Sequence, residues 1–461
     1  MPCGLLRRTL SSIGRAAAVY ALLFGAVGAW VPYIALYLGS RGLDVGGVGA
    51  LLALHATVSL LAAPTWGALA DGVGDARGPI LVAGLLCAAA TALLGLSASP
   101  LVLSVAIAIV ASTFAGIIPM VDSRVVRIIG GRERFGQARA WGSAAFIVVA
   151  FATGAAVGRF GPVGLFVLNV PLLAAAGVGA WVLLRMTGPE PASPIQRRRM
   201  TVDHAVGQAF AGLSPSRIGG VLRIPRMGLF VLASTVIWTA QASLNGFIAL
   251  RVAGLGGDAT MIAAVFSLGA LVEVPLMLSF PRLARRLGAE RLIVIGAFAY
   301  ALRALASALA TSPEQIVAAS IFGGFGFAFV YVGTVTWVSG AVPRTVQATA
   351  QGIATGTTVS VGAIVGSLVG GAIGAALGLS VLFGIAAASY GLGGLLVWAA
   401  IVRRGPSAPS APAAPQAGIT VDSPGASERT STAGASRFAQ ASNRAAGSRR
   451  RAPSSRSSFA G

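Results

Sequence analysis

The sequence predicts an all-α polytopic membrane protein, with twelve transmembrane helices in two six-helix halves and a disordered C-terminal tail. Its mean hydropathy is +0.82, and only 10% of its 461 residues are charged. Soluble globular chains carry about 25% charged residues. Apolar runs long enough to cross a bilayer recur along the chain, and arginines gather in alternate connections between them. These observations predict the class, the helix count and the orientation.

Each predicted span is an apolar run bounded by short polar connections. A bilayer-crossing helix needs roughly 20 mostly apolar residues. The predicted spans are 16–38, 47–70, 78–97, 101–123, 138–158, 162–185, 227–250, 259–280, 290–310, 314–341, 347–375 and 379–402.

The arginines predict which ends of the helices face the cytoplasm. Cytoplasmic connections of membrane proteins are enriched in basic residues. With a cytoplasmic N-terminus, the outside loops keep only Arg41, Arg159 and Arg251. The inside connections then hold Arg77, Arg127, Arg132, Arg134, Arg197, Arg198, Arg199, Arg217, Arg223, Arg282, Arg285, Arg286, Arg291 and Arg344. We therefore expect a multi-pass protein of the cell membrane with both termini in the cytoplasm.

Composition divides the chain into four parts. A six-helix bundle over 1–186 is followed by a cytoplasmic linker over 187–226, which contains PEPASPIQRRR, and by a second bundle over 227–404. The tail, 405–461, is rich in Ser, Ala, Pro and Arg, lacks apolar periodicity and is expected to be disordered. Its arginines either attract anionic lipid or belong to an unselected solvated tail.

Several classes of protein are excluded by the rarity of reactive residues. All 34 basic residues are arginines, so the chain has neither a P-loop lysine nor a Schiff-base lysine. Two cysteines and two histidines, far apart, form no metal motif, and no GxSxG elbow is present. We expect no enzyme activity, cofactor, metal or nucleic-acid partner. The expected partners are a small-molecule substrate, protons and the lipid bilayer, with the chain a monomer.

Four ionisable residues inside predicted spans give the strongest functional signal. An intramembrane charge costs about 3 kcal/mol on insertion scales, so such groups normally face a cavity and have partners. Asp122 and Arg139 lie at the two ends of one helical hairpin, and Glu273 and Arg303 lie on another. We expect one acid–arginine pair in each half. Alternatively, these pairs only hold helices together, with Asp122 neutralising Arg124 or Arg127 and Arg139 reaching the interface.

Other polar residues suggest a central cavity and proton carriers. Glu273, partnered by Arg303, is the first choice for proton coupling, and His55 is a further candidate because imidazole titrates near neutrality. Gln241, Asn245 and Trp30 could line a cavity. For His55 and for the polar residues of the seventh span, the alternative role is interhelical hydrogen bonding.

An internal repeat points to a superfamily. GALADGVGDARG follows the second span and PRLARRLGAERL follows the eighth, so two six-helix halves are related to one another. This describes the major facilitator architecture, and GALADGVGDARG resembles the cytoplasmic signature of that superfamily. Gly72 and Asp75 stand where that signature usually has basic residues. The resemblance implies a conformational-gate role for Gly67, Asp71, Gly74 and Arg77.

A closer resemblance covers nearly all the spans. Pro119 and Asp122, followed by FGQARAWGSAAF over 135–146, resemble helices four and five of the lactose-permease and phenylpropionate-permease-like branch. The same resemblance extends to GAWVPY, APTWGALAD, QATAQG and the position of Arg303. The resemblance implies that Asp122 and Arg139 hold substrate hydroxyls, and that Phe146 replaces the tryptophan on which a sugar stacks.

The sequence also departs from that branch. Gly323 and Gly326 occupy the positions of its helix-ten histidine and glutamate, and helix seven lacks its acids. We expect a secondary active transporter of a small polar organic solute (a sugar, a nucleoside or an aromatic or organic acid), working by alternating access with proton symport. The alternatives are an exporter using proton antiport and a non-transporting membrane sensor.

Overall fold

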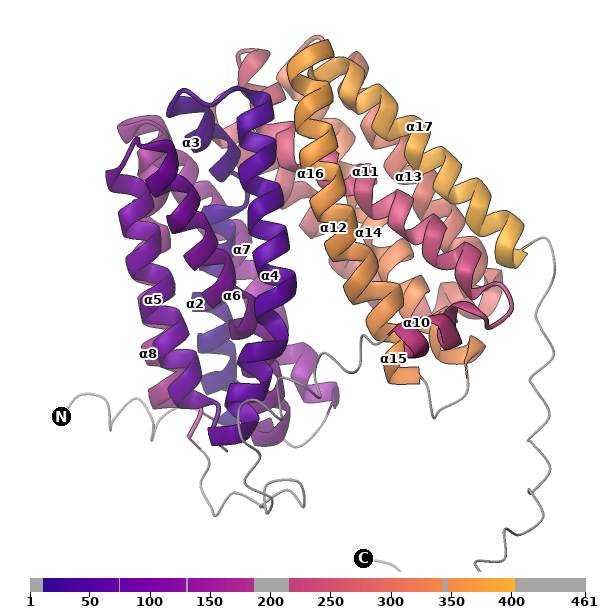
Figure 1. The fold of residues 1–461 in the computed structure, drawn as a ribbon, viewed down its shortest axis with the longest axis horizontal. Coiled ribbons are helices and arrows are strands. Elements are labelled where there is room, and N and C mark those ends of the chain that lie inside the picture. Colours follow the sequence, from indigo (N-terminus) through magenta and orange to yellow (C-terminus); the bar gives the residue numbers. More distant parts are fainter. Residues whose placement is uncertain (1–10, 74, 130–131, 186–214, 343–346, 403–461) are drawn as a thin grey trace, which may run out of the picture. The chain divides into compact units, whose positions relative to one another are not determined.

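The protein is helical throughout the part of the chain that the structure describes. The computed structural model describes residues 11–73, 75–129, 132–185, 215–342 and 347–402. Within these ranges it has helices and turns and no strand, and twelve helices are long and apolar enough to cross a membrane (Figure 1). All twelve predicted spans are confirmed. The 187–214 part of the predicted linker and the predicted tail beyond 402 lie outside the described residues.

Six spans precede the linker. They are built from α2 (Ser12–Trp30), α3 (Ile34–Ser40), α4 (Val45–Val73), α5 (Arg77–Leu96), α6 (Pro100–Ile129), α7 (Arg132–Phe160), η1 (Pro162–Gly164) and α8 (Leu165–Leu183). The first span is interrupted between α2 and α3, and α6 continues six residues past its predicted end.

Six further spans follow. They are built from α11 (Met227–Gly254), α12 (Ala259–Leu287), α13 (Ala289–Leu309), α14 (Pro313–Ala341), α15 (Gln347–Gln351), η2 (Gly352–Thr357), α16 (Thr358–Leu377), α17 (Leu379–Val397) and η3 (Trp398–Val402). The predicted linker also contains a short helix, α10 (Pro215–Leu222). Both η2 and η3 are π-helical turns.

Local sequence sets several helix ends. The Asp258 carboxylate accepts a hydrogen bond from the Met261 N–H (2.8 Å), and Ser11 caps α2 in the same way through Gly14 (3.1 Å). Such side-chain acceptors satisfy amide donors that have no partner within the helix. Gly288 and Gly378, both at φ 85°, end α12 and α16 and allow α13 and α17 to start directly afterwards. A positive φ at both turns favours glycine.

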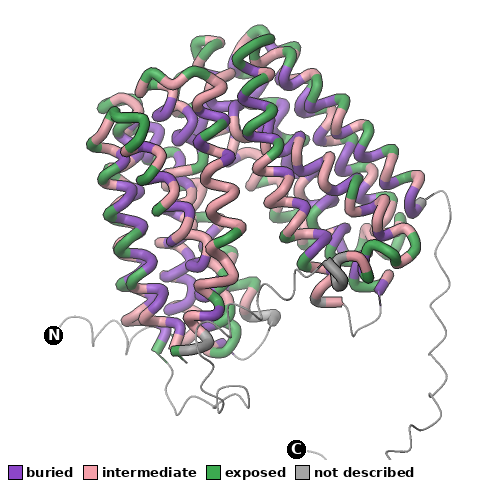
Figure 2. Tube along the Cα trace, in the orientation of Figure 1, coloured by how far each residue is buried: buried purple, intermediate pink, exposed green. Residues whose placement is uncertain are grey.

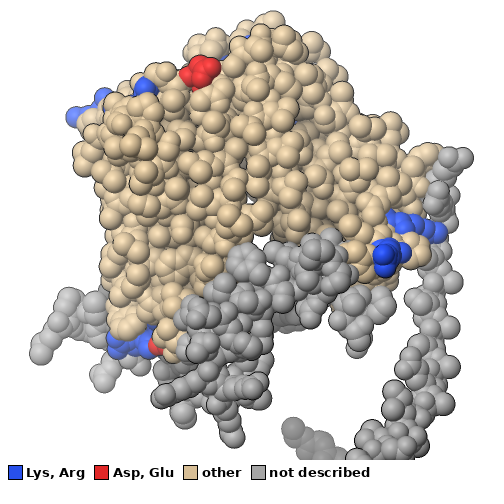
Figure 3. Space-filling view, in the orientation of Figure 1, with Lys and Arg blue, Asp and Glu red and all other residues tan. Residues whose placement is uncertain are grey.

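On one face of the described part of the protein, charged groups lie away from the flank of the helical bundle (Figure 3). On the face drawn in Figure 3, the blue and red side chains lie near the two ends of the helices, and the flank between them is uncharged. Buried residues lie along the inward sides of the helices (Figure 2). A long apolar flank with polar ends is what a bilayer requires of a spanning protein.

The two halves touch near α3. A Cβ added to Gly49 of α4 would lie 2.7 Å from the Gly371 Cα of α16, so these two helices meet backbone to backbone. The Tyr33 hydroxyl lies 2.8 Å from the Ala150 carbonyl oxygen of α7 and 3.0 Å from the Ala259 carbonyl oxygen of α12. Small residues permit such close approach between membrane helices.

Candidate functional site

A cavity of about 240 Å³ is lined by helices of both halves. Phe24 of α2 and Phe146 of α7 line it from the first half, and Asn245, Glu273 and Arg303 line it from α11, α12 and α13. The predicted residues Phe146, Gln241, Asn245, Glu273 and Arg303 therefore share one chamber. Two opposite charges in a chamber at the centre of the helices are the pattern expected of a solute site.

Arg303 is buried at the edge of this chamber. Its side chain is 5% exposed, and its Nη1 donates a hydrogen bond to Asn245 Oδ1 over 3.1 Å. The Nε atom is buried and has no hydrogen-bond partner among the described residues. Gly323 makes room for the side chain, since a Cβ there would lie 3.1 Å from Arg303 Cδ. The absence of a side chain at position 323 thus accommodates Arg303.

The predicted ion pair between Glu273 and Arg303 is wrong. In the described part of the chain, Glu273 makes neither a hydrogen bond nor an ion pair. The reason is that the Arg303 guanidinium reaches Asn245 on α11 and does not reach the carboxylate on α12. Both charged groups still face the same cavity. Their separation leaves each of them available to a solute or a proton.

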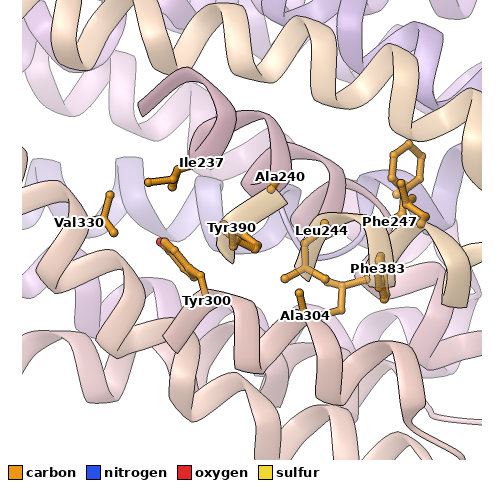
Figure 4. Close-up of a cluster of buried hydrophobic side chains, with 14 of the residues drawn as sticks. Ile237, Ala240, Leu244, Phe247, Tyr300, Ala304, Val330, Phe383 and Tyr390 are labelled. Carbon is orange, nitrogen blue, oxygen red and sulfur yellow. The ribbon is translucent and has the colours of Figure 1, made fainter. Parts of the chain in front are cut away.

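A tyrosine pair supports the chamber from the core of the second half. The rings of Tyr300 and Tyr390 are stacked with centroids 5.0 Å apart, within the buried cluster of Figure 4. The Tyr390 hydroxyl donates to Gln241 Oε1. This contact fixes the orientation of the Gln241 amide, which lines the cavity.

We expect Gly326→Ala to destabilise the protein by about 1–3 kcal/mol, the usual effect of overpacking a core. A Cβ at Gly326 would lie 2.4 Å from the Tyr300 ring. Thermal unfolding of the detergent-solubilised protein measures this change. Gly340→Ala, on the same helix with nothing within 4 Å of its added Cβ, is the matched control and should not lower stability. Equal melting temperatures of the two variants would contradict the packing argument.

A second cavity, of about 300 Å³, lies against the first half. Trp30 and His55 line it together with Asn245, which lines the smaller cavity as well. Most of its other lining residues are apolar. Asn169, which is 1% exposed, also lines it and donates from Nδ2 to the Ala26 carbonyl oxygen over 2.8 Å.

The structure brings Asp122 and Arg139 together. Arg139 Nη1 lies 3.3 Å from Asp122 Oδ1, and the Tyr20 hydroxyl donates to the same oxygen over 2.6 Å. The pair is about one-third exposed and lines neither cavity. It is connected to the smaller cavity through Phe24, because the Arg139 guanidinium carbon lies 4.5 Å from the centre of the Phe24 ring. Such a contact is a cation–π interaction.

In the stretch that contains the gate motif, Asp75 is the residue that pairs with arginines. Arg77 Nη2 lies 2.6 Å from Asp75 Oδ2, and Arg124 Nη1 lies 3.8 Å from Asp75 Oδ1. Burial alone would raise the pKa of Asp75, but the Arg77 hydrogen bonds and the two positive charges hold this pKa below its usual value. The Asp71 side chain and Gly74 lie outside the described residues, and a Cβ added to Gly67 would meet no other group within 4 Å.

Several residues of the site carry no distinctive signal in the sequence. Phe24, Tyr20 and Asn169 lie in the spans of the first half, and Tyr390 lies in the last span. A polar or aromatic side chain inside an apolar run was their only available signal. That signal does not distinguish a cavity wall from helix packing.

The sequence of this chain matches a known family over most of its length. A family described as the MFS_1 like family matches residues 14–384. The chain belongs to this family of major facilitator transporters. Among curated proteins, the maltose permease of Geobacillus stearothermophilus is 27% identical to this transporter over 293 residues, which are 63% of this chain and 69% of the permease.

Solved structures agree on the fold of this major facilitator. The nucleoside transporter NupG aligns with a TM-score of 0.70 and 17% identity, over 85% of this chain and 99% of that one. The POT family transporter PepTSo aligns with a TM-score of 0.64 and 14% identity, over 85% and 98% of the two chains. The protein is therefore a multi-pass membrane protein and a secondary transporter of a small molecule.

Proposed function

We propose that this transporter imports a small polar organic solute together with protons, as a monomer whose termini both lie in the cytoplasm. The observation that carries the proposal is that Glu273 and Arg303 line the same chamber but form no ion pair with each other. One group can bind the solute while the other carries the proton. A sugar, a nucleoside or an organic acid fits the polar groups that line this chamber.

Alternating access explains the contacts between the halves. With cytoplasmic termini, the Gly49–Gly371 approach and the Tyr33–Ala259 hydrogen bond lie at the outer end of the helices. The structure then corresponds to a state closed toward the outside. Separation of α4 from α16 would open the chamber to the outside, as rocking of two halves about a central site requires.

The orientation and the coupling are tested in proteoliposomes. A substrate screen is run with vesicles of both orientations, with and without an imposed pH gradient. Uptake driven by an inward proton gradient supports symport, whereas uptake driven by the opposite gradient identifies a proton antiporter. Absence of any solute movement across a broad panel contradicts transport and leaves a sensor role.

Asp122→Asn is expected to weaken substrate affinity about tenfold without removing coupling, because Asp122 holds Arg139 against Phe24, which lines the smaller cavity. Asparagine keeps an oxygen for the Tyr20 hydroxyl but removes the charge that attracts Arg139. A hydrogen bond to a charged group contributes about 1.5–3 kcal/mol, and 1.4 kcal/mol is tenfold in affinity. The measurement is the KM of initial uptake, with its dependence on the pH gradient.

Asp44→Asn provides the matched control for the Asp122 substitution. Asp44 accepts a hydrogen bond from the Gly47 N–H over 2.8 Å before α4, and asparagine caps a helix equally well. Its KM should stay at the wild-type value. An unchanged KM in Asp122→Asn as well would mean that the Asp122–Arg139 pair only holds α6 against α7.

A further inference from the structure

The two cavities adjoin one another at Asn245. This residue lines both of them, and α2 contributes Phe24 to the smaller cavity and Trp30 to the larger. On α11, Gln241 lines the smaller cavity and Gly246 the larger. Residues so close on the same two helices place the cavities side by side. A shared lining residue makes the two cavities neighbours, as a site that spans both of them requires.

The smaller cavity offers a site for an oxyanion. In the described ranges, the Arg303 guanidinium makes one hydrogen bond, to the neutral Asn245 amide, and no ion pair. A guanidinium has five N–H donors in a planar arrangement that matches a carboxylate. A buried cation without a carboxylate partner is costly, so a ligand that supplies one binds strongly. Arg303 therefore favours an acid over a neutral polyol.

The larger cavity suits an apolar group. Leu52, Phe114 and Leu173 are typical of its lining, and its polar members are few. The hydroxyl groups of a sugar ring would mostly lack partners there, and each unpaired polar group that is buried lowers the affinity. A volume of about 300 Å³ is enough for an aromatic ring with a short side chain.

We infer that the two cavities form one bipartite site for an amphipathic organic anion, whose carboxylate pairs with Arg303 and whose apolar body fills the chamber beside Trp30 and His55. This inference rests on the proposed function and narrows its substrate class. Glu273 lines the same cavity as Arg303. A zwitterion would need Glu273 ionised as the partner of its ammonium group, which would leave the proposed proton carrier occupied. An anion leaves Glu273 free to take up a proton.

The test measures ligand-induced thermal stabilisation of the purified full-length protein in detergent. The probes are benzoate, phenylacetate and 4-phenylbutyrate, which share a carboxylate and differ in the length of the apolar body. Four comparison compounds each lack one feature or differ in charge. Acetate lacks the apolar body, phenylacetamide lacks the negative charge, phenylalanine is a zwitterion, and maltose is a neutral polyol. We expect stabilisation by at least one aromatic acid, with a dissociation constant at least tenfold lower than that of each of the four comparison compounds.

Two variants locate the body of the ligand. Ala56→Leu places a larger side chain in the larger cavity. Among the acids that bind, the longest should lose at least tenfold more affinity than benzoate does. Ala152→Leu, on an exposed face of α7, should leave both affinities unchanged.

In a Cys3→Ser background, Cys87 is the only cysteine and lines the larger cavity. The bound acid should slow its alkylation by N-ethylmaleimide, and Arg303→Gln should remove this protection.

The outcomes separate this inference from the proposed function. If acetate binds as well as the aromatic acids, or phenylacetamide as well as phenylacetate, the bipartite site is wrong. Binding of phenylalanine or maltose more tightly than the aromatic acids also contradicts the bipartite site. If the protein accumulates that compound, proton-coupled transport is still supported. Binding of the acids without their transport would instead support the site and contradict the proposed function.

Discussion

Arg303→Gln is expected to lower the rate of substrate uptake at low concentration by about ten- to a hundredfold. The loss corresponds to about 1.5–3 kcal/mol, the usual contribution of a hydrogen bond to a charged group. Glutamine is long enough to approach Asn245, which accepts the Arg303 hydrogen bond, but it cannot present two parallel donors to a carboxylate. Initial uptake rates in proteoliposomes measure the effect.

The fold should survive this substitution. A buried charge without an opposite charge carries a desolvation cost that no ion pair offsets, and a neutral side chain removes this cost. Arg303 is 5% exposed, and among the described residues it forms no ion pair. We therefore expect an unchanged or higher melting temperature together with the loss of uptake. A variant that loses both would indicate that Arg303 acts in packing.

Two further substitutions refine the test at Arg303. Arg303→Lys keeps the charge but replaces the planar donor arrangement by a single ammonium group, so partial activity is expected. Arg285→Gln removes an arginine from the exposed last turn of α12 and should leave uptake unchanged. If Arg303→Lys behaves as the wild type, charge alone is recognised, and the bidentate geometry is unnecessary.

The sequence predicted the helices well because each depends on local information. A run of about 20 apolar residues is sufficient to specify a span, and the alternation of arginines fixed the number of spans. Helix ends were less accurate, since α6 and α12 continue past the apolar core into polar turns. The contact between Asp122 and Arg139 was predictable because adjacent hairpin helices bring them together.

Contacts across distant helices were not predictable in this way. The Tyr390–Gln241 hydrogen bond joins residues 149 positions apart, and Arg303 reaches Asn245, 58 positions away, in preference to the carboxylate on the adjacent α12. Such choices depend on how each helix is rotated about its axis. Hydrophobic periodicity is weak in a helix that is apolar on nearly every side, so the sequence does not specify this rotation.

The glycines of α14 show a second limit. From the sequence, Gly323 and Gly326 are expected only to replace ionisable residues of the branch that the chain resembles. In the structure each of them leaves room for a large side chain: Gly323 for Arg303 and Gly326 for the Tyr300 ring. A single sequence does not reveal which large side chain a glycine accommodates. Gly323 of α14 and the buried Arg303 side chain are thus parts of one structural arrangement.

Glu273→Gln is expected to abolish concentrative uptake while preserving exchange. If Glu273 carries the proton, one unit of pH gradient supports about tenfold accumulation of a solute that moves with one proton. Glutamine keeps the size and polarity of the side chain but cannot be ionised. The accumulation ratio should fall to about one, whereas counterflow of labelled solute against unlabelled solute should continue. Counterflow in this variant should also become independent of pH.

The matched control for Glu273 is another glutamate of the same half. Glu314 lies in the first turn of α14, is exposed and is not part of the cavity that holds Glu273. Glu314→Gln should accumulate solute as the wild type does. If Glu273→Gln still accumulates solute, the proton is carried elsewhere, and the same assay on His55→Asn then decides whether the larger cavity holds the carrier. If exchange is lost together with accumulation, Glu273 binds the solute, and the division of roles between this carboxylate and Arg303 is wrong.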